Sequence, residues 1–211
     1  MHSDSSPSST KQHRSIKRTW RSLTAGAIAV ALTSISPLAH TTGPRAVTDT
    51  FSATTANMTP AGLTLRLQVL EWQESAARAE AVAALAAGSD AATLLAKLPT
   101  VGYVWPSGSP VGYSVKYAHR EALPDGGERI TLVTDRRMGS YDYKRWSVPS
   151  TAEANDLPYS VIVLTLDSSG AGTGNLVLAG EVMLDETAGT VAIPADAASV
   201  LTNVKREPAK P

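Results

Sequence analysis

The chain has 211 residues, of which 43% are hydrophobic and 18% charged, and it has no cysteine, so disulfides and thiolate metal sites are excluded. Its formal net charge is +0, but residues 1–39 hold five of the 19 basic residues and one of the 19 acidic residues, which leaves 14 and 18, a net charge of −4, for the remainder. A net negative charge disfavours nucleic-acid binding, because proteins bind nucleic acids through a basic surface.

Residues 1–39 have the pattern of a secretory signal. A polar, basic start precedes an apolar run of 13 residues, Leu23–Ile35. That length is typical of a signal core and short for a membrane span. We expect cleavage near Ala39 and a secreted or periplasmic protein, with retention of the run as a membrane anchor as the alternative. Residues 40–59 are rich in Thr, Ala and Ser and predict a flexible linker, with Thr48–Thr54 as an optional first strand.

Residues 60–207 are expected to form a single α+β domain, followed by a disordered tail at 208–211. Alternation of apolar and polar residues predicts that Tyr113, Val115, Tyr117 and His119 share one face of a strand. The stretch Ser160–Leu166 is apolar on both faces, which predicts a central strand covered on both sides. The strands expected in this domain are 63–72, 101–106, 113–119, 129–134, 160–166, 175–184, 191–193 and 199–206.

Two alanine-rich helices are predicted between the early strands, at Glu74–Ala87 and Ala91–Leu98. A stripe of small side chains on the first helix is expected to lie against the sheet; its members are Ala76, Ala79, Ala83 and Ala86. The predicted fold is α+β: one curved antiparallel sheet of about seven to eight strands with the inserted helix pair packed on one face.

The strand 129–134 leads directly into a polar and aromatic segment. Three of the chain's eleven aromatic residues lie between positions 141 and 146. Aromatic and arginine side chains together are typical of contact surfaces, and the alternative is a surface loop whose aromatic residues cap the core. The candidate ligand-binding residues are Asp135, Arg136, Arg137, Tyr141, Tyr143, Arg145 and Trp146, with His119 added from the neighbouring strand.

Catalytic motifs are weak. His119 is the one histidine well placed in the domain, so a histidine metal site is not expected, and no cofactor is predicted. The glycine-rich stretch Asp167–Asn175 fails the phosphate-binding pattern, because Asn175 replaces the third glycine and a strand follows. It is expected to be a hairpin loop. A hydrolase that uses Asp135, His119 and a hydroxyl group is the enzymatic alternative.

Residues 98–167 resemble a family of uncharacterised secreted bacterial proteins. The matching stretches are LPTVGYVW, GYSVKYA and LPDGGERITLVTDRRMG, together with the strand after Pro158-Tyr159. Similar proteins tend to have proline where this chain has Arg137. The resemblance covers about a third of the chain and implies no activity, since the family has none assigned.

The sequence therefore favours an exported, soluble, non-enzymatic protein, while the question of enzymatic activity stays open. We expect it to bind a small or lipidic ligand, or a partner in the cell envelope, through the segment Asp135–Trp146. On this hypothesis Trp146→Ala weakens binding while the fold survives. The alternatives are the hydrolase and a membrane-anchored structural protein of the envelope.

Overall fold

The computed structural model describes residues 45–142, 146–147, 156–179, 181–194 and 200–208. Its helices are α1 (Ser75–Leu85), the 3-10 turn η1 (Gly88–Asp90) and α2 (Ala91–Lys97). Its strands are β1 (Asp49–Thr55), β2 (Thr64–Val69), β3 (Gly102–Pro106), β4 (Tyr113–Ala122), β5 (Glu128–Thr134), β6 (Asp156–Leu166), β7 (Ala171–Ala179), β8 (Met183–Asp185), β9 (Thr190–Ala192) and β10 (Val200–Glu207).

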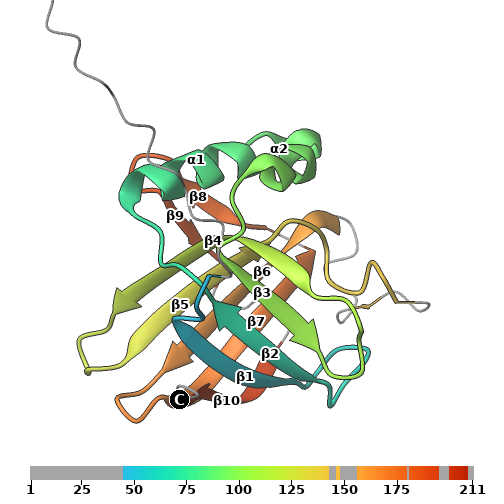
Figure 1. Cartoon of the computed structure of the whole chain (residues 1–211), viewed down its shortest axis with the longest axis vertical. Helices are drawn as coiled ribbons and strands as arrows, with labels where there is room; N and C mark the ends of the chain where they lie inside the picture. Colours follow the sequence, from blue (N-terminus) through green and yellow to red (C-terminus); the bar gives the residue numbers. More distant parts are fainter. Residues whose placement is uncertain (1–44, 143–145, 148–155, 180, 195–199, 209–211) are drawn as a thin grey trace, which may run out of the picture. The chain divides into compact units, whose positions relative to one another are not determined.

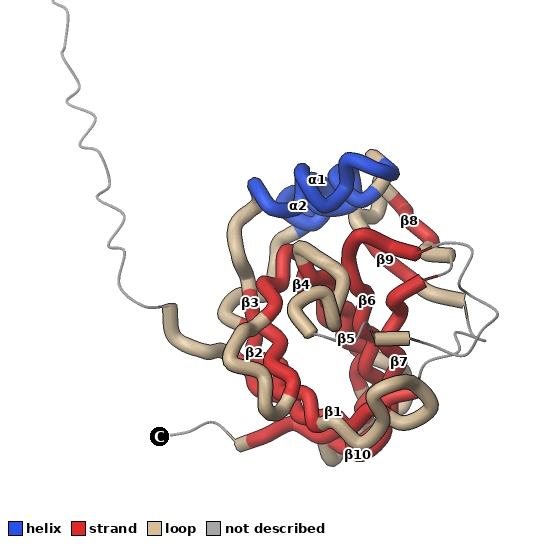
Figure 2. The backbone as a smooth tube through the Cα atoms, turned by 90° about the vertical axis from the view of Figure 1, so that its right-hand side faces the viewer, coloured by secondary structure: helices blue, strands red, loops and turns tan. Residues whose placement is uncertain are grey.

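Eight strands form a closed antiparallel barrel in the order β1-β10-β7-β6-β5-β4-β3-β2 (Figures 1 and 2). The ring closes because β1 pairs with β10 on one side and with β2 on the other. The curved antiparallel sheet and the inserted helix pair confirm the predicted α+β architecture, and the structure adds that the sheet closes into a barrel. The hairpin β8–β9 stands outside the ring as a separate two-stranded sheet.

The interior of the barrel is occupied by its own side chains. Eight strands enclose a space about wide enough for side chains to fill. Phe51, Leu65, Ile130, Leu164 and other inward-facing residues are completely buried and belong to one hydrophobic cluster. Apolar side chains therefore hold the barrel together from within, and burial of each large one contributes about 1.5–3 kcal/mol.

A second hydrophobic cluster lies on the outer wall of β4, β5, β6 and β7, where α1, α2 and β9 cover it (Figure 1). Val161 and Val163 of β6 belong to this outer cluster, whereas Ile162 and Leu164 face inward. The prediction that this strand is covered on both sides is confirmed.

The helix face that contacts the barrel differs from the predicted alanine stripe. Ala76, Ala83 and Ala86 are exposed and Ala79 is half-buried. The buried residues of α1 are Ala81, Val82, Ala84 and Leu85, because the larger apolar side chains take the inner face. Among the described residues no single helix is long and apolar enough to cross a membrane. α1 together with η1 and α2 reaches that length and hydropathy only as a pair bent by 115°.

A β-bulge in β4 changes which side chains share a face. The register with β5 shifts between Val115 and Tyr117, which leaves Lys116 as the extra residue. Tyr113 and Val115 consequently face the interior, while Tyr117 belongs to the outer cluster. The predicted common face for Tyr113, Val115, Tyr117 and His119 is therefore wrong, since the inserted residue reverses the alternation.

The predicted loop Asp167–Asn175 is mostly strand, and the turn is confined to the residues before Ala171. A side chain at Gly172 would collide with the carbonyl oxygen of Thr165, and one at Gly174 would lie 2.6 Å from that of Val163. These glycines permit close approach of the β6 backbone, so they mark a strand here. The predicted strand 175–184 ends at Ala179, and β8 follows separately.

Candidate functional site

The segment that follows β5 crosses one end of the barrel. It begins where the Asp135 N–H donates to the Ser114 carbonyl of β4, at 2.9 Å. It ends where Ser147 pairs with Thr59, which lies between β1 and β2. Because β5 and β1 stand opposite each other in the ring of eight strands, the segment spans that end. We call Asp135–Asp142 with Trp146–Ser147 the end segment; residues 143–145, which include the predicted Tyr143 and Arg145, lie outside the described residues.

Most predicted contact residues in the end segment are buried. Trp146 is 1% exposed and Met138 is fully buried, and both belong to the interior cluster. The Trp146 Nε1 donates to the Asp142 carboxylate. Gly139 has a φ of +80°, and a Cβ there would lie within 2.7 Å of the Trp146 side chain. Trp146 therefore caps the core, and the expectation that its removal leaves the fold intact is at odds with this burial.

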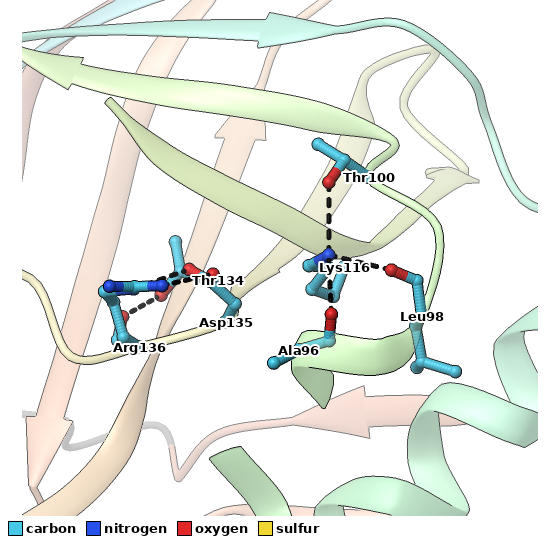
Figure 3. Close-up of polar contacts among 7 residues, drawn as sticks. All are labelled: Ala96, Leu98, Thr100, Lys116, Thr134, Asp135 and Arg136. Carbon is cyan, nitrogen blue, oxygen red and sulfur yellow. Dashed lines mark hydrogen bonds and ion pairs between the residues drawn. The ribbon is translucent and has the colours of Figure 1, made fainter. Parts of the chain in front are cut away.

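The two neighbouring arginines have different surroundings. Arg137 is 9% exposed, and its Nη2 donates to the Trp146 carbonyl at 2.8 Å, which ties the two halves of the end segment together. Arg136 is exposed, and it pairs with the buried Asp135 carboxylate at 3.1 Å (Figure 3). Its guanidinium also lies 5.1 Å from the centre of the Tyr141 ring. Of the predicted residues in this segment, Arg136 and Tyr141 present their side chains to solvent.

A pocket of about 320 Å³ opens between the end segment and the β3–β4 connection. Tyr141 and Val111, which are 44% and 39% exposed, both line it, and Trp146 contributes to its lining from the buried side. Tyr141 is held in place by the Tyr113 ring, 5.2 Å from its own, and by Arg136. The other lining residues are Leu63, Pro106, Ser107, Gly108, Ser109, Pro110 and Asp142.

His119 lies in a different part of the molecule. It pairs with Thr131 in the β4–β5 ladder, whereas Asp135 lies beside Ser114. His119 is five positions after Ser114 along β4, a span of about 15 Å. The Asp135–His119 pair that the hydrolase hypothesis requires is therefore not formed.

His119 lines a second cavity, of about 530 Å³, on the outer wall under β9. Burial lowers the pKa of its imidazole, the nearby Arg78 lowers it further, and Glu121 opposes both. The sequence did not indicate this cavity, because its residues come from five separate strands and the connection after β9. Its polar lining consists of His119, Glu121, Arg129, Thr131, Thr165, Asn175 and Thr190.

A buried lysine beside the end segment is a structural residue. The Lys116 ammonium donates to the carbonyls of Leu98 at 2.7 Å and Ala96 at 3.5 Å, and to the Thr100 hydroxyl at 3.1 Å (Figure 3). Burial lowers its pKa, and Asp135 opposes that shift. An ammonium has three donors and all three are used at the end of α2, so Lys116 has no free donor for a ligand.

The opposite end of the barrel has a charged groove of about 540 Å³, lined by Arg120, Arg206 and two hairpin turns. Arg206 pairs with Asp49 at 3.5 Å and with Glu128, and stacks over Phe51 at 5.2 Å. These partners neutralise the guanidinium and secure the barrel end. Within the described ranges no group of three His, Cys, Asp or Glu residues could hold a metal ion.

Comparison with known proteins adds no relative: no protein-family model, no curated protein and no solved structure matches the chain. The resemblance of residues 98–167 to secreted bacterial proteins stays a prediction.

Proposed function

We propose that the chain is exported and acts as a non-enzymatic binding protein for a small, mainly apolar ligand that enters the pocket beside Tyr141. Export is supported by the basic start and the apolar run Leu23–Ile35. The binding role is supported by the lining of the pocket, which sets the apolar side chains of Leu63, Val111 and Tyr141 beside the polar groups of Ser107, Ser109 and Asp142.

One observation carries the proposal. Four large hydrophobic side chains are exposed among the described residues, and two of them, Val111 and Tyr141, line the same pocket. Leu63 and the buried Trp146 also line this pocket. Two exposed apolar side chains in one pocket, one of them aromatic, are typical of a contact site, whereas isolated exposed apolar residues need no explanation.

The position and size of the pocket favour a compact ligand. The inward-facing side chains of the barrel fill its core, so we place the ligand at the rim and not inside the ring. A volume of about 320 Å³ is at the lower end of the range for small-molecule sites. This suits a molecule of one or two rings better than a lipid with long acyl chains.

Prodan, a neutral fluorescent probe built on a two-ring naphthalene, tests the proposal by fluorescence titration. We expect saturable binding at one site, weakened about five- to tenfold by Tyr141→Ala, since an aromatic contact contributes about 1 kcal/mol. Val111→Ser should also weaken it. Val47→Ser is the matched control, because Val47 is 44% exposed but lies outside the pocket. Absence of saturable binding, or equal losses for the two valine variants, would refute the proposal.

Native mass spectrometry of the protein from its own exported fraction separates the remaining alternatives. A polypeptide mass lacking about 39 residues supports export with cleavage, as the signal pattern predicts, whereas an intact N-terminus supports a membrane-anchored envelope protein. An additional mass that disappears on denaturation identifies the natural ligand. A bare monomer favours a macromolecular partner in the envelope over a small ligand.

A further inference from the structure

The cavity that contains His119 is independent of the pocket beside Tyr141 and has a different chemical character. We propose that it is a second binding site, which takes a neutral, hydroxyl-rich small molecule of mono- to disaccharide size. Four features support this: the polar floor, the hydrogen-bonding capacity of His119 that no described residue uses, the balanced charge, and an apolar wall anchored by hydrogen bonds.

The floor of the cavity consists of two cross-strand rows on the outer face of the barrel. In the first row His119 pairs with Thr131, Thr131 with Val163, and Val163 with Asn175. In the second row Arg129 stands between Glu121 and Thr165. Side chains at directly opposed positions are about 4.5–5.5 Å apart at Cβ. That spacing is close to the spacing of alternate hydroxyl groups on a sugar ring.

His119 brings hydrogen-bonding capacity that no other described residue uses. Its ring contacts Tyr117 edge-on, with 6.4 Å between centroids. No hydrogen bond joins its nitrogen atoms to another described residue. A neutral imidazole has one donor and one acceptor. A ligand hydroxyl can satisfy either of them, because it both donates and accepts.

The charge of the cavity is balanced. Its charged lining residues are Glu121 and Arg129, which form an exposed ion pair at 3.5 Å. His119 is neutral at pH 7, since burial and Arg78 lower the pKa of its imidazole. A strongly anionic or cationic ligand would therefore have no excess of opposite charge in the lining. A neutral hydroxyl group can donate a hydrogen bond to Glu121 or accept one from Arg129.

One wall of the cavity is apolar, and hydrogen bonds anchor the turn that precedes it. It is formed by Val191 and Ala192 of β9 and by Ile193 and Pro194. The preceding turn is anchored at the Gly189 carbonyl, which accepts hydrogen bonds from Tyr117 at 3.1 Å and Arg78 at 3.3 Å. Burial raises the pKa of Tyr117 to about 12, so its phenol stays a donor. An apolar wall facing a polar floor suits a molecule with C–H groups on one side and hydroxyls on the other.

The test is an amide NMR titration of the domain with glucose, N-acetylglucosamine, maltose, trehalose and myo-inositol, and with glucuronate and glucose 6-phosphate as charged counterparts. We expect at least one neutral compound to bind with a Kd below about 1 mM and to shift the amide signals of β4, β5 and β6. Thr165→Val should weaken it about five- to tenfold, as expected for one lost hydrogen bond.

Thr50→Val is the matched control, because Thr50 is a half-buried outward-facing threonine of β1, which is remote from the cavity lining. Tyr141→Ala should leave this binding unchanged, which separates the second site from the first. The proposal is overturned if no neutral compound shifts these signals at about 20 mM, a concentration that would reveal even millimolar affinity. It is also overturned if a charged counterpart binds more tightly, or if the two threonine variants lose affinity equally.

Discussion

Replacing Trp146 by alanine tests whether the end segment is part of the core. The indole is 1% exposed and lies in the interior cluster with Met138. Truncating a buried tryptophan to alanine costs about 3–5 kcal/mol, through lost apolar burial and the cavity that remains. A domain of 150–250 residues loses about 2–4 °C of Tm per kcal/mol, so we expect Tm to fall by roughly 6–20 °C.

The assay is thermal and urea unfolding followed by far-ultraviolet circular dichroism, which does not depend on the tryptophan signal. Tyr141→Ala is the comparison, because Tyr141 is exposed and its contacts are one aromatic pair and one cation–π pair. Its loss should cost about 1–2 kcal/mol. A Trp146→Ala protein that unfolds within 2 °C of the wild type, or a larger loss for Tyr141→Ala, would show that the end segment does not cap the core.

Two further predictions concern the bulge in β4 and the residue that it turns outward. The Gln73 side-chain amide donates to the Lys116 carbonyl at 3.2 Å and accepts from the Ala118 N–H at 2.8 Å. Gln73→Met should therefore lower the free energy of unfolding in urea by about 2–4 kcal/mol. The control Gln68→Met, at a half-exposed outward position, should lower it by less than about 0.5 kcal/mol. An NMR titration should place the pKa of His119 below 6.5, because burial first and Arg78 second disfavour its charged form, against Glu121. Arg129 is the other charged group lining that cavity. Since the folded pKa is depressed, the unfolded chain binds the proton first, and stability should fall as the pH drops from about 6.5 through the folded pKa. His119→Gln should lack that part of the pH dependence, and a pKa above 6.5 would contradict the assignment.

Short-range patterns predicted most individual strands, because the alternation of side chains along a strand is a local property. Ile130 and Leu132 face the interior of the barrel as their spacing indicated. Closure of the barrel was not predicted, since it depends on the pairing of β1 with β10, whose residues are about 150 positions apart in the chain. The local pattern of either strand does not indicate which strand it pairs with.

The candidate contact segment was predicted in the right place, but the roles of its residues were not. Composition alone does not distinguish Trp146 from Tyr141, whereas in the structure Trp146 is buried and Tyr141 is exposed. The difference arises because Tyr113 and Arg136 hold Tyr141 at the rim, while Gly139 leaves room for the indole beneath. Such contacts depend on tertiary packing, which the sequence of the segment does not contain.

The bulge in β4 accounts for both the missed face and the missed cavity. With regular alternation after Val115, His119 would point into the core, where an imidazole without a partner is costly. The extra residue Lys116 reverses the alternation, so that Ala118 enters the interior and His119 lies beside Thr131 on the outer wall. Gln73 satisfies the backbone groups that the bulge leaves without ladder partners. One inserted residue, with its amide partner, therefore places a histidine among hydroxyl groups, and this arrangement is the physical basis of the second proposed site.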